Sequence, residues 1–71
     1  MLQSEVRAAE YRAKAELARA AAQASTMVQV RHRHEVAESV WRELAGSEDR
    51  RTEHAHKAAR QVAVTAARRA A

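Results

Sequence analysis

The sequence predicts an all-α fold, and three features of its composition indicate this. The 71 residues include 19 alanines and 11 arginines, no proline and no phenylalanine, and a single glycine. Alanine, arginine, leucine, glutamate and glutamine favour helices, whereas strands are enriched in β-branched and aromatic residues. A chain of this length forms one domain at most. We therefore expect one helical domain that spans residues 1–71.

We expect three helices, at residues 4–24, 27–45 and 48–69, arranged as a three-helix bundle. Residues 4–45 would form a helical hairpin, and the basic third helix would pack across it. Ser4 is a suitable N-cap for the first helix, with Glu5 in its first turn. This helix can bury a stripe without a polar member, made of Ala8, Tyr11, Ala15, Ala18 and Ala22.

The stretch Met27–Gly46 contains the only tryptophan and half of the large apolar residues. Six of its residues are spaced three and four apart, which is one face of a helix. They are Met27, Val30, His34, Ala37, Trp41 and Leu44. We expect this face to form the core or an interface between copies, because a 71-residue chain with so few large apolar residues buries little surface as a monomer.

The link between the first two helices has two interpretations. The hydroxyls of Ser25 and Thr26 compete with helical backbone bonding, so the chain can turn there and bring Tyr11 against Trp41. The alternative is one long helix over residues 4–45, followed by the helix over 48–69, because a second stripe continues through the link without a break in phase.

Gly46 gives the clearest predicted helix end. It follows Leu44 and Ala45, in the position where a left-handed glycine often ends a helix. Ser47 would then cap the third helix, with Glu48 in its first turn.

A pattern of residues covers positions 10–45. It reads Glu10-Tyr11-Arg12, Ala15-Glu16 and Arg19, then a break, then Val30-Arg31, Ala37-Glu38, Trp41 and Leu44-Ala45. This resembles a class of short, uncharacterised bacterial helical proteins with the pattern Y-R-x-x-A-E-x-x-R, a turn often marked D-P, and A-E-x-W-x-x-L-A. The present chain has Ser25-Thr26-Met27 at the turn and no proline. The resemblance implies a helical hairpin, and it implies no activity or site.

The net charge of +4 is concentrated near the C-terminus, where residues 46–71 carry +3. Cations in this region could neutralise phosphates, and this neutralisation supplies most of the affinity in non-specific nucleic-acid binding. The candidates are Arg50, Arg51, Lys57, Arg60, Arg68 and Arg69. No aromatic residue follows Trp41 to stack on single-stranded bases. We expect no membrane partner, because the apolar side of this segment lacks leucine and aromatics.

The histidines raise the hypothesis of a metal site. The pairs His32/His34 and His54/His56 are separated by two residues, so on a helix their side chains point about 200° apart and cannot share a metal. The useful spacings are His34 with Glu38 and Glu53 with His56, the second being an E-x-x-H. A turn at Gly46 would bring these two pairs together. The absence of cysteine removes thiolate sites and disulfides.

These observations rank three functions, none of them enzymatic. The chain has no cysteine nucleophile and no glycine-rich loop, and Ser39 has no triad spacing to His34 or Glu43. We expect first a helical interaction module, which forms homo-oligomers or binds a protein partner through the Met27–Leu44 face. The second hypothesis is association with nucleic acid or the ribosome, and the third is a metal-binding oligomer without any other cofactor. A cytoplasmic location is expected, because the chain lacks cysteine and its N-terminus lacks the pattern of a signal peptide.

Overall fold

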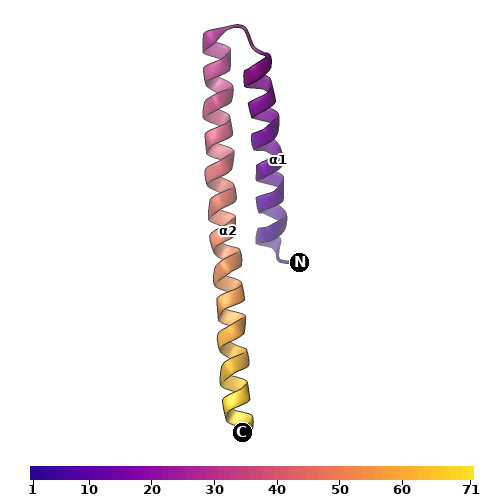
Figure 1. Cartoon of the computed structure of the whole chain (residues 1–71), viewed down its shortest axis with the longest axis vertical. Helices are drawn as coiled ribbons and strands as arrows, with labels where there is room; N and C mark the ends of the chain where they lie inside the picture. Colours follow the sequence, from indigo (N-terminus) through magenta and orange to yellow (C-terminus); the bar gives the residue numbers. More distant parts are fainter.

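The protein is a long helical hairpin (Figure 1), as a computed structural model that describes residues 1–71 shows. Helix α1 spans Gln3–Ala24 and helix α2 spans Val28–Ala70. The molecule measures 66 × 16 × 12 Å, and its radius of gyration is 18.6 Å. A compact domain of this length would have a radius of gyration of roughly 11 Å. The all-helical prediction is confirmed, but the fold is a rod and not a bundle.

Helix α2 is almost twice as long as α1 and extends far beyond it. The N-terminus lies beside the middle of α2, whereas the C-terminus lies at the far end of the rod (Figure 1). The last contacts between the helices join Ser4 to Thr52, at 2.7 Å between their hydroxyl oxygens, and Glu5 to His56, at 3.5 Å. We call residues 57–70 of α2 the arm, because no part of α1 covers them.

The chain turns over residues 25–27, as the hairpin interpretation predicts, so the alternative of one long helix over residues 4–45 is wrong. Ser25 and Met27 both have extended backbone angles, with ψ of 133° and 122°. The Ser25 hydroxyl accepts a hydrogen bond from the Met27 amide at 3.3 Å. Arg31 donates from its guanidinium to the Ser25 carbonyl at 2.9 Å, which ties the first turn of α2 to the end of α1.

The predicted third helix over residues 48–69 is wrong, because α2 continues through Gly46 without a break. Gly46 does not have a positive φ. A glycine inside a helix costs about 1 kcal/mol relative to alanine. Ala45, directly before it, is buried, and its apolar packing on α1 offsets part of this cost. The predicted capping residue Ser47 instead accepts a hydrogen bond from Arg50 at 3.3 Å.

The fully buried residues of the interface between the helices are almost all alanine. Four of the five predicted stripe residues of α1 are buried, and these are Ala8, Ala15, Ala18 and Ala22. On α2 the buried residues are Ala45 and Glu48, and no large side chain anywhere is fully buried. Leu44 is a predicted member of the apolar face of α2. It lies at the edge of the interface, with 38% of its surface exposed.

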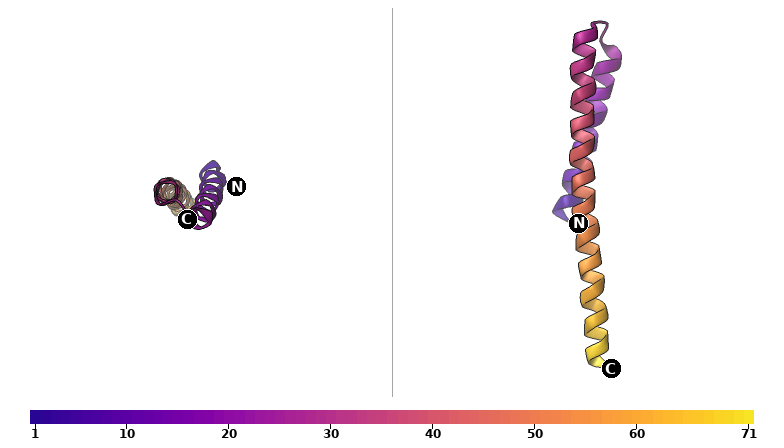
Figure 2. Two further views of the ribbon diagram at one scale, coloured as in Figure 1. Left: turned by 90° about the horizontal axis from the view of Figure 1, so that it is seen from above. Right: turned by 90° about the vertical axis from the view of Figure 1, so that its left-hand side faces the viewer.

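The start of α1 differs from the prediction. Ser4 does not cap α1, whose N-cap is Leu2. It lies instead on the interface, opposite Thr52. In the right-hand view of Figure 2, α1 passes from one side of α2 near the turn to the other side near the N-terminus. A stripe with spacings of three and four produces this shallow crossing, as in a left-handed coiled coil.

The substitution Gly46→Ala should raise the free energy of unfolding by about 0.5–1 kcal/mol. An added Cβ would meet only the end of the Arg50 side chain, at 3.7 Å, and the backbone is helical. Urea unfolding of the two proteins at equal concentration measures the difference. A loss of stability would contradict the continuous helix, since alanine is strained in a left-handed helix end.

Candidate functional site

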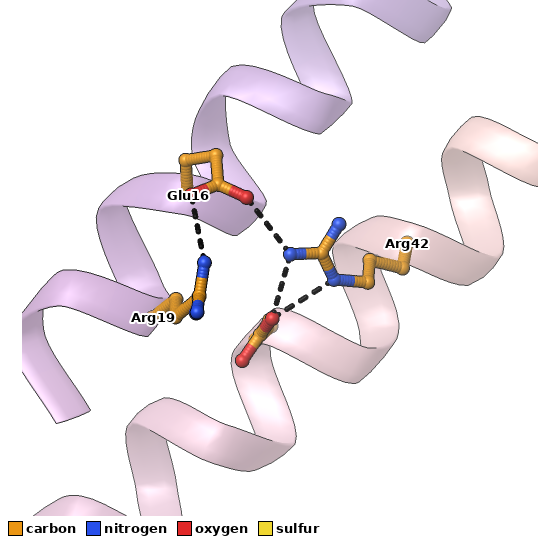
Figure 3. A network of polar contacts seen from close by, with 4 residues as sticks. Glu16, Arg19 and Arg42 are labelled. Atoms are coloured by element: carbon orange, nitrogen blue, oxygen red, sulfur yellow. Dashed lines mark hydrogen bonds and ion pairs between the residues drawn. The ribbon is translucent and has the colours of Figure 1, made fainter. Parts of the chain in front are cut away.

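One long side of the hairpin carries a network of ion pairs centred on Arg42 (Figure 3). The Arg42 guanidinium donates to Glu38, with a shortest N···O distance of 2.7 Å, and across the interface to Glu16 at 3.0 Å. Arg19 lies 3.8 Å from the other oxygen of Glu16. The hydrogen bond to Glu38, and then that to Glu16, raises the pKa of Arg42 above its ordinary value. The guanidinium therefore stays charged and links the two helices.

The other ion pair between charged groups of the two helices lies on the same side. Arg12 contacts Asp49 at 3.1 Å, and both side chains are more than half exposed. Asp49 follows Arg42 by seven residues, or two turns of α2, so the two lie on one flank of the helix. We call this side the polar flank. Exposed pairs contribute about 0–1 kcal/mol each, so their main effect is to fix orientation.

The opposite side of the hairpin is more apolar. A shallow groove between the helices is lined by Leu17, Ala18 and Ala21 of α1 and by Ala37 and Trp41 of α2, together with Lys14 and His34. Ala37 directly precedes Glu38, and Trp41 directly precedes Arg42. Successive residues of a helix are about 100° apart around its axis, so Ala37 and Trp41 lie on a different side of α2 from the Arg42 network.

Beside this groove, α2 exposes a row of large apolar side chains at i, i+4 spacing. Val36, Val40 and Leu44 are 48%, 47% and 38% exposed, and Leu17 on α1 is 71% exposed. We call the groove and this row the apolar flank. Large apolar side chains left exposed on one side of a monomer often mark a binding surface, so the flank is the best candidate for one.

The two aromatic residues meet as predicted, and they lie at the base of the apolar flank. The rings of Tyr11 and Trp41 stack with centroids 5.8 Å apart and planes inclined by 19°. The Lys14 ammonium lies 4.8 Å from the centroid of a Trp41 ring. Stacking adds about 0.5–1.5 kcal/mol beyond area burial, a large share for an interface made of alanine.

Glu48 is the one charged residue buried in the interface, and the sequence stripe did not predict it. One carboxylate oxygen pairs with Arg51 at 3.0 Å, while the other oxygen has no hydrogen-bond partner. Glu48 lies one turn before Thr52 on α2, which places it level with Ala8 of α1. A methyl group there offers no donor, so this carboxylate weakens the middle of the hairpin.

The predicted metal ligands do not come together. They depended on a turn at Gly46, and without it Glu38 and Glu53 lie on one straight helix, roughly 22 Å apart along its axis. Glu38 is held by Arg42, and Glu53 pairs with Arg60 at 3.2 Å. His34 lines the groove of the apolar flank. No group of three or more potential ligands is arranged to hold a metal ion.

The predicted interface residues divide into two groups. Val30, His34, Ala37 and Trp41 are half-buried between the helices. Met27 lies in the turn and is 65% exposed, and Leu44 belongs to the apolar flank. The exposed row of Val36, Val40 and Leu44 is not evident from the sequence. Residues at i, i+4 spacing could equally belong to a wider buried face of the helix.

The predicted phosphate-binding cations are all exposed on the second half of α2. Arg50, Arg51 and Arg60 are hydrogen-bonded to residues of their own helix, namely Ser47, Glu48 and Glu53. Lys57, Arg68 and Arg69 have no ion-pair partner within the chain. These cations therefore form an exposed basic surface on and just before the arm.

No protein-family model matches the chain, and neither a curated protein nor a solved structure matches it. The resemblance of residues 10–45 to short bacterial helical proteins therefore stays a prediction. Neither α1 nor α2 combines the length and the apolar character that crossing a membrane requires.

A double-mutant cycle of Tyr11→Ala and Trp41→Ala should give a coupling energy of about 0.5–1.5 kcal/mol, because either change alone removes the stacking. Urea unfolding of the four proteins measures it. Tyr11→Ala combined with Val64→Ala is the control, since Val64 lies in the arm and its effect should add independently. Additive losses for Tyr11 and Trp41 would show that the rings do not stack in solution.

Proposed function

We propose that this protein is a non-enzymatic assembly module that pairs with a second copy of itself through the apolar flank. The observation that carries the proposal is the composition of the interface. Its buried residues are five alanines and Glu48, while the larger residues Leu17, Val36, Val40 and Leu44 are left exposed. A pair of flanks would bury these side chains against one another.

The energetics of a lone hairpin support this proposal. Burying apolar area contributes about 25 cal/mol per Å², and alanine offers little area. Small domains with such thin cores usually need disulfides, metals or oligomerisation. The chain has no cysteine, and no ligands are grouped for a metal. Oligomerisation is therefore the means of stabilisation that this chain has.

Two hairpins packed flank to flank would form a four-helix assembly with an isologous interface. Residues 1–56 carry nine basic and nine acidic residues, so no net charge opposes the approach of two hairpins. Residues 57–71 carry four basic residues and no acidic one. Repulsion between these segments favours an antiparallel pair, in which the two arms project from opposite ends.

The double substitution Val40→Lys with Leu44→Lys should abolish assembly, because it places two charges in the centre of the proposed interface. Both side chains are substantially exposed in the hairpin, and lysine favours helices, so the hairpin can still form. Light scattering should show the native mass fall to the 7.9 kDa of a single chain. Far-UV circular dichroism at the same concentrations reports the helix content.

Ser39→Lys is the matched control. It adds a lysine to the exposed surface of α2 at a position outside the apolar flank, and should leave the native mass unchanged. A wild-type protein that is monomeric and fully helical at high micromolar concentration would contradict the proposal. An oligomer that survives the double substitution would contradict the assigned surface.

A further inference from the structure

The arm carries the whole excess positive charge of the protein. Residues 57–71 contain Lys57, Arg60, Arg68 and Arg69 and no acidic residue. Their charge of +4 equals the net charge of the whole chain. The hairpin formed by residues 1–56 is neutral by formal charge. The fold therefore separates a neutral body from a cationic helix that projects beyond the N-terminus of α1 (Figure 1).

Two of the four cations of the arm, Lys57 and Arg68, lie on one line along a straight helix. Arg50 precedes Lys57 by seven residues and Lys57 precedes Arg68 by eleven, which are close to two and three whole turns. The three side chains therefore form one line along α2, with axial separations of roughly 10 and 16 Å. Arg60 and Arg69 lie on either side of this line. Ala59, Val62 and Ala66 lie on the other side of the helix, where Arg69 follows Val62 by two turns.

We propose that the arm binds the phosphate backbone of double-stranded nucleic acid without reading its sequence. Lys57 and Arg68 are exposed on one line of α2, so this line would lie along the phosphates of one strand, with Arg60 beside it. Arginine is well suited to bidentate phosphate contact.

The composition of the arm favours a duplex over other polyanions. Binding to a membrane surface needs leucine or aromatic residues on the apolar face, and here that face has alanine and one valine. Single strands are bound by stacking bases on aromatic side chains, and no aromatic residue follows Trp41. A rigid helix that holds Lys57 and Arg68 on one line suits a duplex, because the phosphates of a duplex also have fixed positions.

The test measures binding of the full chain to a fluorescent 30-base-pair DNA by anisotropy at 50 and 200 mM salt. Three or four phosphate contacts predict a loss of affinity of roughly 40- to 150-fold over this range. Lys57→Gln with Arg68→Gln should weaken binding at 50 mM by roughly tenfold or more and reduce the salt slope by about two.

Arg7→Gln with Arg33→Gln is the matched control, because it removes the same charge from exposed positions on the hairpin that form no ion pair. Equal losses in the two double variants, or no binding to DNA at 50 mM salt, would overturn the proposal. Tighter binding to a single strand of equal length, or to vesicles containing phosphatidylserine, would also overturn it. Both double variants should keep the helix content of the wild type.

Discussion

Close packing of two helices through alanine is the constraint on which the rest of this structure depends. Alanine methyl groups let α1 and α2 approach closely, so side chains at the edges can reach across the interface, as Arg12 does to Asp49 and Arg42 to Glu16. The same small side chains bury little apolar area. Because alanine methyl groups fill the buried part of the interface between the helices, the larger side chains of Leu17, Val40 and Leu44 lie outside it. The small buried apolar area and the exposed apolar flank therefore both follow from the use of alanine at the interface.

Much of the hairpin could be predicted from the sequence, because its signals are regular and local. The spacing of Ala8, Ala15 and Ala22 identified the buried face of α1, and the hydroxyls near position 25 identified the turn. The pairing of Tyr11 with Trp41 followed from folding the chain at that turn. Each of these features depends on residues within one helix or on the length of the connecting link.

The path of the chain after Gly46 could not be predicted in this way. A glycine followed by Ser47 and Glu48 is a strong local stop signal, and the signal is worth only about 1 kcal/mol. What favours the continuous helix is the packing of Ala45 on α1, which depends on the register of the two helices. The wrong helix end also made the predicted convergence of Glu38 with His56 wrong, because that convergence required a fold back at Gly46. The exposed row that includes Val40 could not be predicted for the same reason, since its exposure depends on where α1 lies.

The neutral hairpin and the cationic arm give the two proposed interactions opposite responses to salt. Added salt screens repulsion between the arms of two copies and leaves burial of the apolar flank intact, whereas it weakens contact with phosphates. An antiparallel pair of hairpins would also present two arms at opposite ends of one particle. Two linked sites on one duplex raise the overall affinity without any new contact.

The measurement that tests this account most directly is the distance along α2 between two spin labels. The chain has no native cysteine, so cysteines at the exposed positions 39 and 65 can be labelled selectively, and dilution with unlabelled protein removes distances between copies. A continuous helix through Gly46 predicts a separation of roughly 40 Å. A separation of roughly 20 Å would mean that the chain folds back at Gly46, and the uncovered arm would not exist.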